Sequence, residues 1–274
     1  MTKPFELTKR QKIRLRSRIQ ALGILLVAIA IVVGACAAAI HVRNEKKERQ
    51  AALEAQIAAE QAAAQAAAEE AARLAAEEAA RPPEVDLDAW YMTLVNIDHL
   101  LEEEFEPELT EIENEQSFDS RAATHLQALI QAARDAGHTV YFCSGYRDYY
   151  TQSGIYWMHV DDFVAAGMSE EEAHATTRLQ VNYPGASEHQ LGLAADILEY
   201  KDQPMESHIG GSGLMLWLEQ NCADYGFVIR YPADKTDITG ISYEPWHLRY
   251  VGPEAAHYMM ERGLCLEEFL ALYE

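Results

Sequence analysis

The chain has little cysteine and, beyond its first 50 residues, little positive charge. Only four cysteines occur in 274 residues, and no two of them have CxxC spacing. This pattern predicts neither a disulfide framework nor a thiolate metal site. A single disulfide with one free thiol among Cys143, Cys222 and Cys265 stays open, because sequence alone does not choose a pairing.

The positive charge is concentrated at the start of the chain. Eleven of the 22 Lys and Arg residues lie in residues 1–50 with three acidic residues, which leaves eleven basic and 41 acidic residues for the rest. A surface of this sign offers no basic patch to a phosphate backbone, so we expect no nucleic-acid partner. It suits solubility and the repulsion of anionic polymers.

One long apolar run follows the basic start. Residues 21–40 hold no charged side chain, and a helix of this length spans roughly 30 Å of hydrocarbon. Seven basic residues precede the run and four follow it before residue 50, which predicts that the N-terminus stays inside. We expect a cytoplasmic basic leader over residues 1–20 and a transmembrane anchor in membrane lipid over residues 21–41. The protein would then be a single-pass cell-membrane protein with an extracytoplasmic C-terminal domain.

An alternative for this segment is a cleaved lipoprotein signal. Val33-Gly34-Ala35-Cys36 resembles a bacterial lipobox, in which Cys36 would carry the lipid. The apolar run continues to Ile40, however, and the basic leader is long for a signal peptide. These features favour an uncleaved anchor.

A stretch of biased composition comes next. Residues 45–81 are almost entirely Ala, Glu, Gln, Lys and Arg, the strongest helix formers. They contain only three large apolar side chains, too few for the heptad seam of a coiled coil. We therefore expect a single solvated helix that ends at Pro82 and Pro83, forming a stalk over residues 42–84.

Residues 85–274 have the length of a typical single domain. Strand and helix patterns mix in this part without regular βαβ alternation, so we expect an α+β fold: a small antiparallel sheet with surrounding helices. Asp119 is expected to cap a helix over residues 120–136. The expected strands cover residues 139–143, 193–198, 227–231 and 243–251.

Two side chains in one segment suggest a metal site. His189 ends a loop, and Asp196 lies seven residues later inside an apolar strand. An unpaired carboxylate in such a strand would be costly, and a bound cation removes that cost. The simpler alternative is a buried Asp held by hydrogen bonds.

A second segment offers a third ligand and a base. Catalytic zinc sites use three protein ligands and keep one position open, and His247 can complete such a set. Glu244 lies three residues earlier, before Pro245, where it can take a proton from water at the open position. The alternative for Glu244 is an exposed charge at a strand end.

A third segment contributes a cation. Arg147 follows the Ser144-Gly145 turn, and its planar guanidinium suits a carboxylate or a developing oxyanion. The alternative is a surface Arg paired with nearby acids.

Three motifs in this order resemble the VanY-type zinc D-alanyl-D-alanine carboxypeptidases, a group that includes D-Ala-D-Ala dipeptidases and L,D-carboxypeptidases. They are SGYRDYYTQ at residues 144–152, PGASEHQLGLAADI at residues 184–197 and EPWHLRYVG at residues 244–252. The resemblance covers about residues 92–274. One position departs from the family pattern: Asp148 stands where Ser is more common, and its charge beside Arg147 suggests an ion pair or a tuned pocket.

The resemblance implies Zn²⁺ as cofactor and a role for each matched residue. It implies zinc ligands at His189, Asp196 and His247, a general base at Glu244, a substrate-binding or transition-state-stabilising cation at Arg147, and pocket residues at Gln152 and Ser187.

The implied activity is removal of the terminal D-Ala from peptidoglycan stem peptides by a membrane-anchored zinc carboxypeptidase. Three alternatives remain from the same motifs: an L,D-carboxypeptidase, a peptidoglycan endopeptidase, and a non-catalytic zinc-containing module that binds the cell wall. The presence of Glu244 argues against the last, because such a module has no need of the base.

Overall fold

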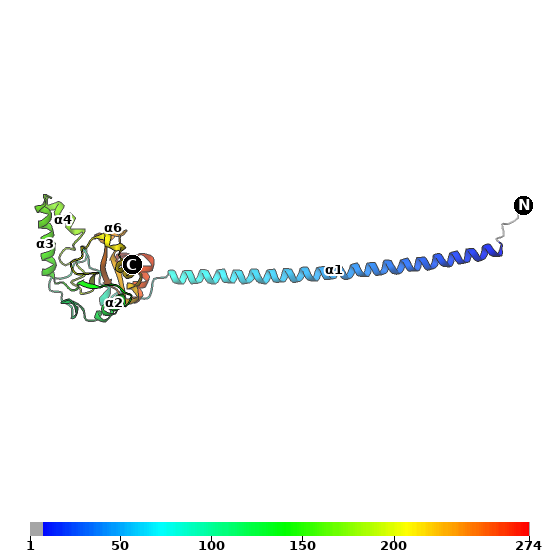
Figure 1. Ribbon diagram of the computed structural model, residues 1–274, viewed down its shortest axis with the longest axis horizontal. Coiled ribbons are helices and arrows are strands. Elements are labelled where there is room, and N and C mark those ends of the chain that lie inside the picture. Colours follow the sequence, from blue (N-terminus) through cyan, green and yellow to red (C-terminus); the bar gives the residue numbers. More distant parts are fainter. Residues whose placement is uncertain (1–7, 274) are drawn as a thin grey trace. The chain divides into compact units, whose positions relative to one another are not determined.

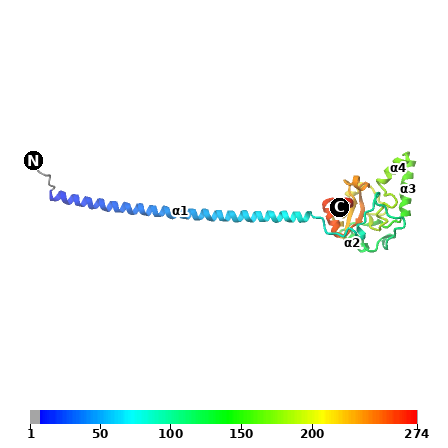
Figure 2. The same ribbon diagram turned by 180° about the vertical axis from the view of Figure 1, so that it is seen from behind.

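The computed structural model describes residues 8–273, so residues 1–7 of the expected basic leader lie outside the described residues. The chain divides into two compact units, residues 1–81 and residues 82–274 (Figures 1 and 2). Each unit is described by itself.

The first unit is one continuous helix, α1, which runs from Lys9 to Ala80. Its side chains are exposed along the whole length over which burial is described. It is the one described helix that is long and apolar enough to cross a membrane, and no part of its most apolar window is buried by protein. The helix ends as predicted at the prolines. Arg81 is extended (φ −67°, ψ 134°), because Pro82 disfavours helical backbone in the residue before it.

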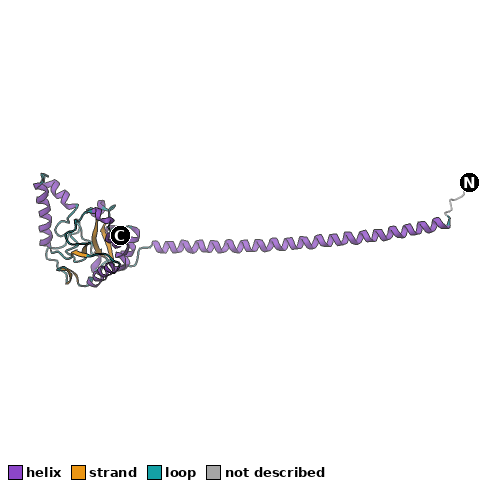
Figure 3. Ribbon diagram, viewed as in Figure 1, coloured by secondary structure: helices purple, strands orange, loops and turns teal. Residues whose placement is uncertain are grey.

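The second unit is built on a four-stranded antiparallel sheet, with helices around it (Figure 3). This confirms the predicted α+β class. The strand order is β3 (Tyr141–Ser144), β4 (Ala194–Leu198), β6 (Glu244–Tyr250) and β5 (Phe227–Tyr231). All residues of β4 and β5 are buried, as are all of β6 after its first.

A separate hairpin was not predicted. β1 (Leu109–Glu113) pairs with β2 (Gln116–Asp119), and the turn between them has positive φ at Asn114 and Glu115. Two successive left-handed residues fit the twist of a tight hairpin. The pair Asn-Glu is a weaker turn signal than Asn-Gly, so the sequence did not reveal this turn.

The predicted cap at Asp119 is wrong. Asp119 ends β2, and its buried carboxylate binds the guanidinium of Arg121 at 2.6 Å and 2.9 Å. The helix α2 begins only at Ala123 and runs to Asp135. The carboxylate of Asp119 therefore pairs with the Arg121 guanidinium. No side chain caps the first N–H groups of α2.

Helices cover the sheet and pack on a shared core. They are α3 (Tyr149–Ala165), α4 (Glu170–Arg178), α5 (Gly213–Asn221), α6 (Thr236–Thr239), α7 (Pro253–Arg262) and α8 (Leu266–Ala271), with short 3-10 segments at Trp90–Met92, Ser207–Gly211 and Cys222–Tyr225. The main core joins sheet residues such as Phe142 and Leu248 with Leu126 of α2 and Leu218 of α5. A second cluster lies under α7 and α8. All four cysteines are in the described part of the chain, and none forms a disulfide.

The helices α3 and α4 form a hairpin at one end of this unit (Figure 1). The hairpin has a small core of its own, which contains Tyr156, Val160 and Ala173. The base of the hairpin forms one wall of the cleft described next.

Candidate metal centre

Three side chains meet because of how the sheet is paired. Asp196 on β4 and His247 on β6 are direct cross-strand partners. His189 reaches them from the turn that precedes β4, where the amide of Gly192 donates to the carbonyl of His189. His189 and His247 are at most 2% exposed and Asp196 is 5% exposed.

The donor atoms lie at distances that suit a metal. His189 Nε2 is 3.3 Å from Asp196 Oδ2, and His247 Nδ1 is 3.0 Å from Asp196 Oδ1. One donor atom from each residue can be chosen so that all three lie within 4.8 Å of one another. Donors of a tetrahedral zinc with bonds of about 2.0–2.1 Å stand about 3.3 Å apart. His189 Nε2 and Asp196 Oδ1 are buried without a hydrogen-bond partner, so this donor set fits a cation.

The ring of His189 is oriented by the backbone of the SGYR turn. Its Nδ1 lies 2.6 Å from the carbonyl oxygen of Gly145, so Nδ1 carries the proton and Nε2 faces Asp196. A Cβ at position 145 would lie 2.2 Å from the carbonyl oxygen of Ser117. The turn therefore needs glycine to bring this carbonyl to the histidine.

Burial and charge set the protonation of the three residues. Burial lowers the pKa of His189 to about 4, and the charge of Arg147 acts in the same direction. Burial would also lower the pKa of His247, but the neighbouring carboxylates of Asp196 and Glu188 outweigh it and raise this pKa to about 9. The pKa of Asp196 is lowered, since the two histidines outweigh the effect of burial. Asp196 is thus an ionised carboxylate beside a neutral imidazole, His189.

Glu244 lies beside the donor set, at the first position of β6. Its Oε2 is 3.6 Å from His247 Nδ1, and its side chain is 14% exposed. Burial raises the pKa of Glu244 to about 8, the charge of Asp196 raises it further, and His247 and Arg147 oppose the shift. The alternative of an exposed strand-end charge is therefore wrong.

Arg147 follows β3, and its amide donates to the carbonyl of His189 at 3.1 Å. Burial lowers the pKa of Arg147, although the charges of Asp196 and Glu244 oppose this. Its Nε is buried without a partner, and no ion pair joins it to a carboxylate of the described residues. The nearby Asp148 caps α3 instead, accepting from the amide of Thr151 at 2.6 Å.

The donor set borders a cleft of about 560 Å³. Gln152 lines it, donates to the carbonyl of Asn182 at 2.6 Å and keeps a buried Oε1 without a partner. Ser187 is buried two residues before His189, and its Oγ also has no partner. The cleft lining comprises Arg147, Gln152, Ile155, His159, Leu179, Gln180, Val181, Asn182, His189, Asp196, Met205, Glu206, Ser207, Ser242, Tyr243, Glu244, Trp246 and His247.

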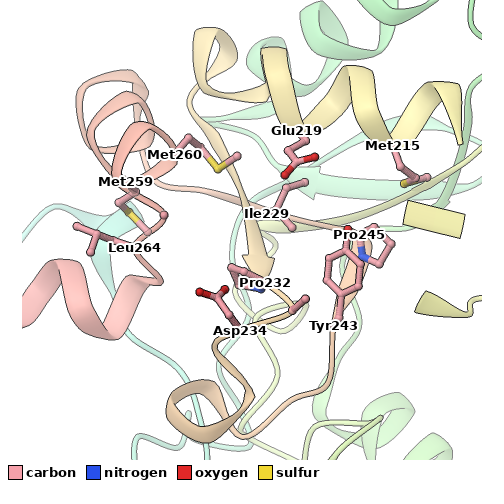
Figure 4. Close-up of a pocket in the computed structure, with 12 residues that line it drawn as sticks. Met215, Glu219, Ile229, Pro232, Asp234, Tyr243, Pro245, Met259, Met260 and Leu264 are labelled. Carbon is pink, nitrogen blue, oxygen red and sulfur yellow. The ribbon is translucent and has the colours of Figure 1, made fainter. Parts of the chain in front are cut away.

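A second pocket of about 270 Å³ is lined by none of the predicted site residues (Figure 4). Methionine, leucine and proline residues form half of its lining, which also contains the exposed residues Glu219 and Asp234. Tyr243 lines both pockets. This pocket offers no histidine and none of the three donor residues.

Sequence reasoning missed a buried ionic group behind the donor set. Glu188, Arg230 and Arg249 are each at most 1% exposed, and both arginines bind the carboxylate of Glu188 at 2.6 Å. The sequence did contain a signal for this group, the same one that pointed to Asp196: a charged residue inside an apolar strand. Arg230 and Arg249 both meet that description, on β5 and β6.

This fold and site define a class: a small α+β metallohydrolase with a His-Asp-His donor set, a buried carboxyl group and a cation at the cleft. Comparison with known proteins narrows the class. The family model of the VanY D-alanyl-D-alanine carboxypeptidases matches residues 115–253. The chain belongs to this family.

Individual relatives agree with this assignment. A D-alanyl-D-alanine carboxypeptidase of Enterococcus faecalis is 41% identical over 185 residues, which cover 68% of this chain and 67% of that protein. The putative carboxypeptidase YodJ of Bacillus subtilis is 36% identical, over 65% of this chain and 66% of its own length. The matches thus span about two thirds of these curated relatives.

Solved structures share the fold. VanYB in complex with D-alanine-D-alanine is 40% identical, covers 68% of this chain and 100% of its own, and has a TM-score of 0.62. A VanY variant from a VanB-type cassette in complex with Zn(II) is also 40% identical, covers 66% of this chain and 99% of its own, and has a TM-score of 0.60.

Proposed function

We propose that this chain, a zinc-dependent D-alanyl-D-alanine carboxypeptidase by its family, removes the terminal D-Ala of peptidoglycan stem peptides at the cleft beside His189. The observation that carries the proposal is the buried His-Asp-His donor set with the carboxyl group of Glu244 next to it. A cation site alone would need only the donors. The adjacent carboxyl group adds a proton carrier, which hydrolysis requires.

The proposed zinc ligands are His189 through Nε2, Asp196 through its carboxylate and His247 through Nδ1. The spacing of these atoms supports this assignment, as do the unpartnered Nε2 of His189 and Oδ1 of Asp196. Zinc bound there supplies Lewis acidity toward the scissile carbonyl and toward water. Two imidazoles and one carboxylate leave one position open, as catalytic sites require.

Glu244 is the proposed general base. A carboxylate Oε atom takes the proton of the attacking water and then passes it to the amine of the leaving D-Ala. Its raised pKa supports this role, because a base works best when its proton affinity suits both steps near neutral pH.

Arg147, Gln152 and Ser187 are the proposed substrate-binding residues. Arg147 is the one Arg or Lys among the residues that line the cleft. A free terminal carboxylate is otherwise repelled by the acidic domain, so the guanidinium is suited to hold it or to stabilise the developing oxyanion. The unpartnered Oε1 of Gln152, which lines the cleft, suits a substrate amide group. Ser187 also has an unpartnered Oγ, but it does not line the cleft, so its role rests on the family resemblance.

The proposed placement is a single-pass membrane anchor with the enzyme domain outside the cytoplasm. The proposed segments are a leader over residues 1–20, an anchor over residues 21–41, a stalk over residues 42–84 and a zinc carboxypeptidase domain over residues 85–274. Since α1 runs unbroken from Lys9 to Ala80, the boundaries of these segments stay predictions. Protease added to intact protoplasts should digest the domain, and protection of the domain would contradict the orientation.

The test of activity uses the full-length protein in detergent, loaded with zinc. Stem pentapeptides that end in D-Ala-D-Ala should lose one D-Ala by mass spectrometry, and C-terminally amidated forms should stay intact. Glu244→Gln should bind zinc but lose about 10²–10⁴-fold in turnover, the range of a positioned acid-base group.

The outcomes separate the alternatives. Cleavage of tetrapeptides in place of pentapeptides would indicate L,D-carboxypeptidase activity. Equal rates on free and amidated termini would indicate an endopeptidase. Binding of stem peptides without any cleavage would indicate a cell-wall binding module. Near-full activity of Glu244→Gln would contradict the assigned base.

A further inference from the structure

Glu188 lies against the metal-ligand candidate His247, on the ring edge that faces away from Asp196. The Nδ1 of His247 is directed to Asp196 at 3.0 Å, whereas its Nε2 is 3.7 Å from Glu188 Oε2. His247 Nε2 and Glu188 Oε2 are both buried, and neither atom has a hydrogen-bond partner. The separation exceeds a normal hydrogen bond, so a bond between these two atoms requires the imidazole and the carboxylate to move closer.

The other carboxylate oxygen of Glu188 is firmly held. Its Oε1 accepts from Arg230 Nε and from Arg249 Nη1, each at 2.6 Å. Arg230 also binds both carboxylate oxygens of Glu267 on α8, at 2.7 Å and 2.9 Å. Arg249 donates further to the carbonyls of Tyr91 and Thr93. The position of Glu188 is therefore set by groups that do not border the cleft.

The local sequence explains this arrangement. Glu188 directly precedes His189, so one dipeptide contributes a candidate ligand and the carboxylate that faces the other histidine. On β6, His247 and Arg249 are two residues apart and point to the same face of the sheet. Arg249 thus brings Glu188 beside His247 by the geometry of the strand.

A purely structural ion group would account for part of these contacts. Two buried arginines need carboxylates, and Glu188 and Glu267 supply them. That explanation uses only one oxygen of Glu188. It leaves the second oxygen, which has no partner, facing the unpartnered Nε2 of His247.

We propose that Glu188 is a positioning residue that accepts the Nε2 proton of His247 and so directs Nδ1 toward the metal. It would play for His247 the part that the carbonyl of Gly145 plays for His189. Carboxylates behind ligating histidines fix the tautomer and ring orientation, and their loss typically weakens metal binding 10–100-fold. This inference rests on the proposed function only in taking His247 as a zinc ligand.

The test is the zinc affinity of Glu188→Gln in the full-length protein in detergent, measured by competition with a chromophoric chelator. Glutamine keeps one oxygen for the two arginines but presents an amide N–H₂ to His247 Nε2. We expect zinc affinity to fall about 10–100-fold.

The matched control is Glu267→Gln, which disturbs the same ion group on the far side of Arg230. It should lower thermal stability and leave zinc affinity within about twofold of wild type, as expected for a group that acts only on the fold. Equal zinc affinity in Glu188→Gln and wild type would overturn the proposal. If wild type itself bound no zinc, the proposed function would fail instead.

A second measurement needs no variant, in case Glu188→Gln does not fold. In zinc-loaded wild type with ¹⁵N-labelled histidine, the ring nitrogens of His247 should show a protonated Nε2 and a metal-bound Nδ1. A metal-bound Nε2 would rule out Glu188 as its acceptor.

Discussion

The two units of this protein differ from an ordinary water-soluble protein in opposite ways: one exposes apolar side chains, and the other buries charged ones. The helix α1 exposes apolar side chains such as Ile24 at 72% and Ile31 at 67%. Residues 82–274 bury charged side chains, among them Glu188 and Arg249, which are completely inaccessible. Exposed apolar surface and buried charge are both unfavourable unless a partner compensates. The exposed apolar surface of α1 is consistent with a membrane anchor, and the buried charges of Glu188 and Arg249 are compensated by ion pairing.

The units also differ in what holds them together. In α1, the stabilising contacts are local, for example Gln56 to Glu60 and Gln65 to Glu69 one turn apart. Such pairs contribute only about 0.2–0.5 kcal/mol each. In the second unit, strands distant in sequence share a core. A substitution in α1 should therefore affect the stability of nearby helical turns only, whereas a substitution in the sheet should affect the stability of the whole domain.

The largest expected effect concerns the apolar half of α1. Leu26→Arg with Ile29→Arg should weaken membrane insertion by roughly 5–7 kcal/mol, from about 2.5–3.5 kcal/mol for each central Arg. The measurement is the fraction that resists carbonate extraction, with turnover on soluble peptides unchanged. Ala62→Arg with Ala66→Arg is the control and should stay in the membrane fraction. If both pairs behaved alike, the anchor assignment would be wrong.

The next effect should be confined to the second unit. His189→Ala removes one of three proposed ligands, so zinc should be lost and turnover should fall by at least about 10³-fold. Membrane association should not change. His257→Ala is the control, because His257 is half exposed and pairs with Asp224 at the surface. Zinc content by atomic absorption checks the result, and a zinc-loaded His189→Ala protein would contradict the assignment.

A smaller effect concerns the pH dependence of stability. Burial would raise the pKa of Glu267, but Arg230 outweighs it and lowers this pKa below its ordinary value. The ionised group is thus favoured in the folded state, so its contribution is present above about pH 4.5 and is lost as pH falls through the lowered pKa.

Glu267→Gln should therefore reduce the free energy of unfolding at pH 7 by roughly 1–3 kcal/mol and flatten its decline in acid. Urea titrations between pH 3 and pH 7 test this. Glu261→Gln, at a site 70% exposed, should change little. A Glu267→Gln protein as acid-sensitive as wild type would show that other carboxylates dominate.

The smallest effect compares one substitution in both units. Ala66→Gly should cost at most about 1 kcal/mol of local helix stability and leave turnover unchanged. Ala195→Gly in β4 removes a methyl group with 0% exposure and should lower the melting temperature of the whole domain. Hydrogen exchange distinguishes the two. Faster exchange across the sheet after Ala66→Gly would contradict the independence of the units.

Sequence reasoning succeeded where the signal was local. The strand over residues 227–231 was predicted with the bounds that the structure has, because an apolar run follows Gly226. It failed at the hairpin of β1 and β2, whose turn lacks glycine, and at Asp119, where a neighbouring Arg competes for the carboxylate.

At the candidate site, the sequence supplied the residues but not their contacts. The motifs pointed to Asp196 and His247, yet only the strand register makes them partners. The role of Glu188 was hidden for the same reason. Its partners Arg230 and Arg249 lie 42 and 61 residues away, and such separations leave no periodic pattern in a sequence.

The pairing of β4 with β6 makes the proposed metal site a product of long-range folding. Asp196 and His247 are 51 positions apart in the chain, and one residue of slippage would turn their side chains to opposite faces. A nascent or truncated chain without β6 has only two of the three donors. Tight zinc binding by the proposed ligands would therefore report that the sheet is complete, and a chromophoric metal such as cobalt would make this step of folding visible.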